Sequence, residues 1–268
     1  MRLLAAPGKL TGGKILFEGK TCYGKLENGM VYPISGDLFG SFTVGSVGIP
    51  LEKAKLLAPA DPSKIVAIGK NYVDHINEMS AMAAPALPEE PEVFLKPPSA
   101  ILNPGEDIVY PIGAQRVDYE AEIAVIVKKK ARYVKKEEVM DYIFGLTLLN
   151  DVSRRDKAKT TTQWVNGKGY DTFCPIGPWI TTVDSLSGIT IRSHLNGELR
   201  QNATIEDMIF GIPEIFEFVT NRMTLMPGDV IATGTPSGVA PMQVGDVIVI
   251  SSDELGELKN QVVAEVPR

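Results

Sequence analysis

The sequence has few of the residues on which many enzyme classes depend. It has two histidines and two cysteines in 268 residues, which excludes a zinc centre with three histidine ligands and gives no disulfide framework. It contains no GxxxxGK[ST], GxGxxG, HExxH or GxSxG motif, so the nucleotide-binding, zinc-protease and serine-hydrolase signatures are missing. Any catalysis must therefore depend on carboxylates, with a histidine to assist them.

Charge and hydropathy exclude further classes of protein. The net charge is 27 − 33 = −6, which argues against a general nucleic-acid or anionic-membrane surface. No apolar run approaches the ~20 residues that span a bilayer, and the first residues, MRLLAAPGKLTGGK, lack the features of a secretory signal. Because two cysteines do not make a disulfide framework, we expect a cytoplasmic protein. The acidic balance and the lack of long apolar runs predict neither nucleic-acid nor membrane partners.

The pattern of apolar residues, glycines and prolines changes near residue 60. Residues 1–58 alternate short apolar runs with glycine turns, a pattern typical of short strands. The segment APADPSK (58–64) contains two prolines and indicates a linker. We therefore predict a small β-rich domain over residues 1–60 and a larger domain over residues 61–268.

Helices are few in the second part. KKEEVMDYIFG (135–145) predicts a helix that Gly145 could end, and IPEIFEFVTNRM (212–223) predicts a helix with an apolar stripe. The stretch MSAMAAPALPEEPE (79–92) has three prolines and little apolar bulk, so it favours an irregular segment. We expect residues 76–92 to form a mobile lid over a site.

An acidic strand is the most informative feature. In VDYEAEIAVIV (117–127), alternation places Asp118, Glu120 and Glu122 on one face. Asp151 ends the apolar run YIFGLTLLND. One interpretation is a strand face that meets solvent. The other is a platform of carboxylates for a hard cation such as Mg²⁺, Mn²⁺ or Ca²⁺, which would leave open positions for a chelating substrate.

Three further motifs carry candidate chemistry. In NYVDHINE (71–78), His75 and Glu78 share one face of a helical turn, which suits either a base with its orienting carboxylate or a surface pair. In GKGYDTFCPIGPWI (167–180), Lys168 could stabilise developing negative charge or be a solvated turn residue. In IATGTPSGV (231–239), Thr235 and its neighbouring N–H groups could hold an anion or form a plain β-turn.

Taken in order, six stretches resemble the fumarylacetoacetate hydrolase family: GKNYVDHINEM, FLKPPSAIL, VDYEAEIAVIV, LNDVSRRD, GKGYDTFCPIGPW and IATGTPSGV. The resemblance implies an α+β, predominantly β fold with a mixed β-roll, and a homodimer. It implies one Mg²⁺ or Mn²⁺ per subunit on Glu120, Glu122 and Asp151. Catalytic roles fall to His75, Glu78 and Lys168, and substrate contacts to Arg155 and Thr235. Residues 1–58 resemble the small N-terminal domain of the shorter bacterial members.

The sequence departs from the family pattern at specific positions. The stretch IVAIG, before the histidine, lacks the aspartate that serves as a fourth metal ligand in fumarylacetoacetate hydrolases proper, which indicates the smaller three-ligand members. Arg154 replaces the usual alanine before the arginine, and Ala158 replaces the glutamine three positions after it. Loss of that glutamine predicts a changed substrate tail or an altered activity.

These features predict a metal-dependent hydrolase that cleaves a C–C bond in small 2-oxo or 1,3-diketo acids, of acylpyruvate or fumarylpyruvate type, through a metal-stabilised enolate. One alternative is an isomerase or decarboxylase of 2-hydroxyhepta-2,4-diene-1,7-dioate type, or an oxaloacetate decarboxylase or tautomerase. The substrate would then be a 2-oxo or 2-hydroxydienoic acid, as in the catabolism of aromatic compounds. Another alternative, which Ala158 keeps open, is a non-catalytic protein that binds metal or carboxylate.

Overall fold

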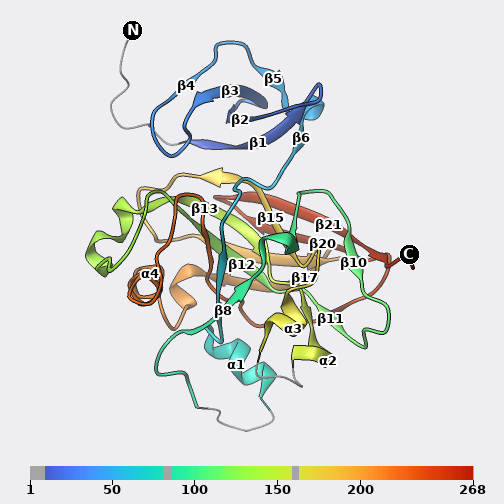
Figure 1. Cartoon of the computed structure of the whole chain (residues 1–268). Coiled ribbons are helices and arrows are strands. Elements are labelled where there is room, and N and C mark those ends of the chain that lie inside the picture. Colours follow the sequence, from blue (N-terminus) through green and yellow to red (C-terminus); the bar gives the residue numbers. More distant parts are fainter. Residues whose placement is uncertain (1–9, 81–85, 159–162, 268) are drawn as a thin grey trace.

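The structure is a computed structural model that describes residues 10–80, 86–158 and 163–267. Figure 1 shows a small group of N-terminal strands on one side of a larger body. Strands predominate and the helices are short, which confirms the predicted α+β, mostly β fold class. The largest sheet contains both parallel and antiparallel pairs, as a mixed β-roll requires.

The N-terminal strands form hairpins with tight turns. The strands are β1 (Thr11–Phe17), β2 (Lys20–Glu27), β3 (Met30–Gly36), β4 (Phe42–Val44), β5 (Ile49–Pro50) and β6 (Lys55–Leu56), and η1 (Leu51–Lys53) is a 3-10 turn. The turn between β2 and β3 has positive φ at both Asn28 (51°) and Gly29 (73°), the conformation that a two-residue hairpin loop needs. The strands that the glycine turns predict are therefore present.

The largest sheet joins the N-terminal strands to the rest of the chain. It has the order β4-β3-β2-β1-β15-β13-β12-β18-β7-β8. Beyond β1 its members are β15 (Cys174–Thr181), β13 (Ile143–Asn150), β12 (Ala121–Val127), β18 (Val230–Ala232), β7 (Ile65–Gly69) and β8 (Glu92–Lys96), and β9 (Ile101–Leu102) pairs with β15. Because β1 pairs directly with β15, the sheet runs without interruption across the predicted boundary near residue 60, and the division into two domains stays a prediction.

Two smaller sheets complete the body. One has the order β10-β21-β20-β16-β17 and the other β14-β11-β19. Their strands are β10 (Ile108–Tyr110), β21 (Gly256–Ala264), β20 (Val247–Ser252), β16 (Thr190–Leu195), β17 (Glu198–Thr204), β14 (Ser153–Arg154), β11 (Val117–Asp118) and β19 (Pro241–Met242). The predicted acidic strand is thus divided into β11 and β12, with Tyr119 and Glu120 between them.

The longest helix follows the prediction and another segment does not. Helix α4 (Ile212–Thr220) buries the predicted stripe except Met223, which lies beyond its end. Helices α1 (Val73–Met79), α2 (Arg155–Ala158) and α3 (Val165–Lys168) are shorter, and η2 (Pro98–Ala100) and η4 (Ile205–Asp207) are 3-10 turns. The helix predicted over 135–145 is wrong. A 3-10 helix, η3 (Lys136–Asp141), ends before β13, and Gly145 lies inside that strand, where a Cβ would meet the Thr181 carbonyl oxygen at 2.6 Å. Close strand packing explains this glycine.

Two apolar layers enclose β12. Its odd-numbered side chains, from Ala121 to Val127, join one core cluster, which also contains residues of α4 and of the five-stranded sheet. Its even-numbered Ala124 and Ile126 join the other cluster. Glu122 shares the second face because side chains alternate along a strand. The acidic residues therefore lie at one end of a buried layer.

Two further predictions concern a lid and membrane-spanning segments. The lid predicted over residues 76–92 contains residues 81–85, which lie outside the described residues; within it, α1 ends at Met79 and β8 begins at Glu92. Among the described helices, none has the length and apolar character needed to cross a bilayer.

Candidate active site

Three buried carboxylates meet at the end of β12. Glu120 lies in the break before this strand, Glu122 lies on it, and Asp151 follows β13. One oxygen from each lies within 4.8 Å of the others. Strand register produces this convergence, because Ala121 pairs with Asn150 and the Asp151 N–H donates to the Glu120 carbonyl at 2.9 Å. All residues from 117 to 127 are buried, so the interpretation as a solvent-facing strand is wrong.

Side chains satisfy the backbone where the strand is interrupted. The Glu120 N–H donates to Asn150 Oδ1 at 2.9 Å, and the Ala121 N–H donates to Gln201 Oε1 at 3.1 Å. Gln201 belongs to β17, is fully buried, and donates through Nε2 to Thr235 Oγ1 at 2.8 Å. These bonds remove the cost of buried unpaired N–H groups and fix the backbone that carries the carboxylates.

Three cationic side chains surround the carboxylates. Lys168, at the end of α3, donates through Nζ to Glu120 Oε2 at 2.7 Å and also to Asp151 Oδ2. Arg155 bridges Asp118, at 2.7 Å, and Glu120. Lys96 on β8, with a side chain that is 0% exposed, donates to Asp151 Oδ1 at 2.6 Å and to the Lys168 carbonyl. Lys96 lies in the stretch FLKPPSAIL, and no local motif predicts a role for it.

The carboxylates differ in how well their charges are compensated. Burial opposes the ionised form of Glu120, but Lys168 and Arg155 hold its pKa far below the ordinary value. Burial raises the pKa of Glu122 well above normal, and the nearby Asp151 and Glu120 raise it further. Glu122 accepts a hydrogen bond from the Gly234 N–H at 2.9 Å, yet no described lysine or arginine forms an ion pair with it. The cluster thus lacks positive charge on its Glu122 side.

His75 and Glu78 lie on α1, as the sequence predicts. The His75 side chain is buried, and its Nδ1 lies 3.6 Å from Glu78 Oε2 without forming a hydrogen bond. The Gly238 N–H donates to both Glu78 oxygens at 3.1 Å, which ties the carboxylate to the loop after β18. Burial lowers the pKa of His75 despite the opposing charge of Glu120. The imidazole is therefore neutral near pH 7 and can accept a proton.

The loop after β18 braces the carboxylates. The Thr235 hydroxyl donates to the Ala121 carbonyl at 2.9 Å and accepts from Gln201. Thr235 lines the pocket, but its hydroxyl proton is used within the protein. The predicted anion-holding N–H of this loop belongs to Gly234 and binds Glu122, so here the anion is a protein carboxylate.

The two departures from the family pattern have different surroundings. Arg154 points to Asp156, at 3.1 Å, and to the Gly113 carbonyl, at 2.8 Å, and it does not line the pocket. Ala158 does line the pocket. An alanine at that position leaves a methyl group where a glutamine would supply a hydrogen-bonding amide.

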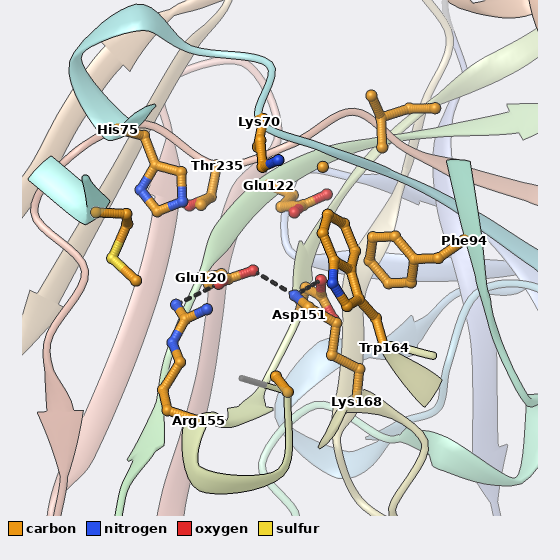
Figure 2. A pocket seen from close by; sticks show the side chains of 14 residues that line it. Lys70, His75, Phe94, Glu120, Glu122, Asp151, Arg155, Trp164, Lys168 and Thr235 are labelled. Carbon is orange, nitrogen blue, oxygen red and sulfur yellow. Dashed lines mark hydrogen bonds and ion pairs between the residues drawn. The ribbon is translucent and has the colours of Figure 1, made fainter. Parts of the chain in front are cut away.

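A pocket of about 230 Å³ covers the carboxylates. Figure 2 shows His75 on one side, Trp164 and Phe94 on the other, and the carboxylates between them. Lys70, Arg155, Lys168 and Thr235 also line this pocket. The structure therefore brings all eight predicted site residues into one region: seven line the pocket, and a carboxylate oxygen of Glu78 lies 3.6 Å from Nδ1 of His75.

The donor set fits a divalent metal ion. Three carboxylates that each offer an oxygen within 4.8 Å of the others suit Mg²⁺ or Mn²⁺ and do not suit zinc. Glu122 gives a second reason for a cation: burial raises its pKa, and none of the described lysines or arginines forms an ion pair with it, so a bound cation would favour its ionised form. Glu120, Glu122 and Asp151 are the residues that would hold it.

Fold and site together define a mostly β protein with a mixed sheet and a buried acidic triad. The family model described as fumarylacetoacetate (FAA) hydrolase C-terminal matches residues 64–263, and the model described as Rv2993c-like, N-terminal matches residues 13–59. The chain belongs to the fumarylacetoacetate hydrolase family. Members of this family are enzymes, among them isomerases, tautomerases and hydrolases.

Three relatives illustrate the range of activities. Oxaloacetate tautomerase YisK of Bacillus subtilis is 42% identical over 233 residues, which cover 82% of this chain and 76% of that protein. A solved 2-hydroxyhepta-2,4-diene-1,7-dioate isomerase from Mycobacterium marinum is 35% identical with a TM-score of 0.88, and covers 96% of this chain and 100% of its own. Maleylpyruvate hydrolase from Sphingobium sp. SYK-6, solved with manganese(II) and pyruvate, is 30% identical with a TM-score of 0.79 and the same coverage.

Proposed function

We propose that the protein is a divalent-metal-dependent enzyme of small 2-oxo acids, and that keto–enol tautomerisation of an oxaloacetate-type acid is the reaction its site supports best. The observation that carries this proposal is the buried, neutral His75 across the pocket from the acidic triad. Tautomerisation needs one base beside a polarised 2-oxo group, and His75 supplies it. The similarity to an oxaloacetate tautomerase supports the same reaction.

The chain's own residues would divide the work as follows. When bound by Glu120, Glu122 and Asp151, Mg²⁺ or Mn²⁺ supplies Lewis acidity that stabilises negative charge on the 2-oxo group. In enolisation, neutral His75 would take the proton from C3 of the keto form, and the resulting imidazolium would pass a proton, directly or through water, to the 2-oxo oxygen. Ketonisation reverses both transfers. Glu78 orients the imidazole. Lys168 remains protonated because, although burial opposes its charge, Asp151 and Glu120 raise its pKa, so it contributes fixed positive charge.

Hydrolysis of a C–C bond, which the sequence predicts, is the second candidate. The placement of His75 and Glu78 on one helix favours it, because a base oriented by a carboxylate can also deprotonate water. The manganese-bound maleylpyruvate hydrolase is a relative with this chemistry. Arg155 and Thr235 remain proposed substrate contacts in either case, although both are already engaged by protein groups.

Substrate assays with Mg²⁺ distinguish these reactions. The enol absorbance of oxaloacetate measures tautomerisation, and release of pyruvate from acylpyruvates measures hydrolysis. We expect faster enol–keto conversion that EDTA abolishes and that His75→Gln lowers by about 100-fold or more. His194→Gln is the matched control, since His194 lies on β16, outside the pocket lining. Pyruvate release without tautomerisation would favour the hydrolase, and absence of both would leave a binding protein.

A further inference from the structure

A second hollow lies next to the pocket, and the side chains of Phe94 and Trp164, called the aromatic wall below, line both. The second hollow, of about 950 Å³, lies beside β8, and its lining is mixed. Leu95, Val165 and Phe218 are among its apolar residues, and its polar or charged residues are Glu90, Glu92, Gln163 and Arg222. Among the described residues, Phe94 and Trp164 are the ones that line both hollows. These two rings therefore stand between the acidic pocket and the outer hollow.

The wall is held in place from several sides. The rings of Phe94 and Trp164 pack edge to face, with centroids 5.1 Å apart at an angle of 72°. The Lys168 Nζ lies 5.0 Å from the centre of the Phe94 ring, which couples the wall to the lysine between Glu120 and Asp151. A Cβ on Gly69 would lie 2.2 Å from Cζ3 of Trp164. Glycine at 69 therefore gives the indole the space it occupies.

We propose that Trp164, seated on Gly69 and packed against Phe94, is a specificity-determining residue that limits this site to 2-oxo acids with short tails. The inference rests on the proposed function for the class of acid. Figure 2 shows Trp164 on the side of the carboxylates opposite His75. A 2-oxo group near the carboxylates, with C3 toward His75, would therefore direct the tail toward the indole. Ala158 provides no amide to bind a polar tail. Removing the indole would join a pocket of about 230 Å³ to a hollow of about 950 Å³.

Calorimetric titration of the Mg²⁺-loaded protein with pyruvate and with 2-oxooctanoate tests the proposal. We expect the wild-type protein to favour pyruvate and Trp164→Ala to shift the ratio of dissociation constants toward 2-oxooctanoate by about tenfold or more. Trp164→Phe should give a smaller shift, because it refills part of the space. The matched control is Trp179→Ala: this second tryptophan lies on β15, outside both hollows, and its removal should leave the ratio unchanged.

A crystal structure of Trp164→Ala makes the partition testable apart from binding. One continuous cavity from Glu122 to Phe218 supports the role of the indole, and two separate hollows overturn it. A joined cavity with an unchanged binding ratio also overturns the assignment of specificity to Trp164. If neither acid binds to any variant, the proposed function fails and the specificity role falls with it, while the crystal structure still decides whether Trp164 is the barrier.

Discussion

The N-terminal strands and the strands of the site belong to the same sheet but differ in how deeply their side chains are buried. Along β2, one of eight residues is fully buried, whereas every residue of β12 and β13 is. Charged residues in the first region meet water: the Lys25–Glu27 pair is 30% and 52% exposed. The Lys96–Asp151 pair is 0% and 1% exposed. A charge on β2 therefore costs little, while a charge beside β12 must be compensated.

This contrast explains why acidic residues carry information in one region and not in the other. Glu27 lies on a strand with a solvated face and needs no special role. Glu122 lies between two apolar layers, where a carboxylate persists only with a hydrogen bond, a cation or a function. The following predictions test the difference between these regions.

The largest expected effect comes from Glu122. Glu122→Gln removes one proposed metal ligand and should abolish Mg²⁺-dependent turnover, with a loss of metal affinity of at least about 100-fold, since even supporting residues of metal sites cost 10–100-fold. Isothermal titration with Mn²⁺ and the oxaloacetate assay measure both quantities. Glu27→Gln is the matched control and should change neither. Full activity in Glu122→Gln would refute the metal role.

Removing a buried cation should cost stability. Lys96→Met removes the lysine 2.6 Å from Asp151 Oδ1 and leaves Lys168 as the remaining cationic partner of Asp151 among the described residues. We expect the free energy of unfolding of the metal-free protein to fall by about 3 kcal/mol. Lys25→Met, which breaks the exposed pair, should cost less than about 1 kcal/mol. Urea titrations of the two variants measure the difference. Equal losses would mean that the two regions compensate charge alike.

The pH profile should show the burial of His75. The base acts when neutral, and burial lowers its pKa from the ordinary 6.5. The neutral form therefore persists as the pH falls through 6.5, and kcat/KM should decline only at lower pH. His194→Gln should keep this acidic limb. A limb above pH 6.5 in the wild-type protein would contradict the assigned direction of the shift.

The smallest difference between the two regions is expected for the stability cost of removing a buried methyl group. Ile15 on β1 and Ile126 on β12 are both buried, at 1% and 0% exposure. Ile15→Val and Ile126→Val should each lower the free energy of unfolding by about 0.5–1.5 kcal/mol, with turnover unchanged. Chemical denaturation and the activity assay check these outcomes. A much larger loss in one strand would place the difference in packing as well as in charge.

Local patterns predicted the elements whose causes are local. The hairpin at Asn28–Gly29 and the stripe of α4 follow from turn chemistry and periodicity. The spacing of Glu120 and Glu122 indicated a shared face, and the position of Asp151 at the end of an apolar run made it the third candidate; the family resemblance favoured the metal site over a solvated strand. Burial on both faces, which distinguishes the platform from a solvated strand, comes from elements far away in the sequence.

The missed residues act across long separations. Lys96 reaches Asp151 over 55 positions, and Gln201 reaches Ala121 over 80, so no local spacing connects them. The one local sign of a role for Lys96 was a charged residue between the apolar pair Phe94–Leu95 and two prolines. The false helix over 135–145 arose because η3 has helical composition, while the need of Gly145 to approach Thr181 appears only when β13 and β15 are packed together.

Because β1 pairs with β15, the N-terminal strands cover the backbone hydrogen-bonding groups at one end of β15. Thr11 and Gly12 occupy the hydrogen-bonding groups at the end of β15, opposite Thr181 and Ile180. A fragment beginning after residue 56 would present that end as an unpaired border, ready to recruit a strand from another molecule. The N-terminal hairpins therefore cover an end of β15 that could otherwise pair with another molecule, in the same sheet that carries the acidic triad on β12.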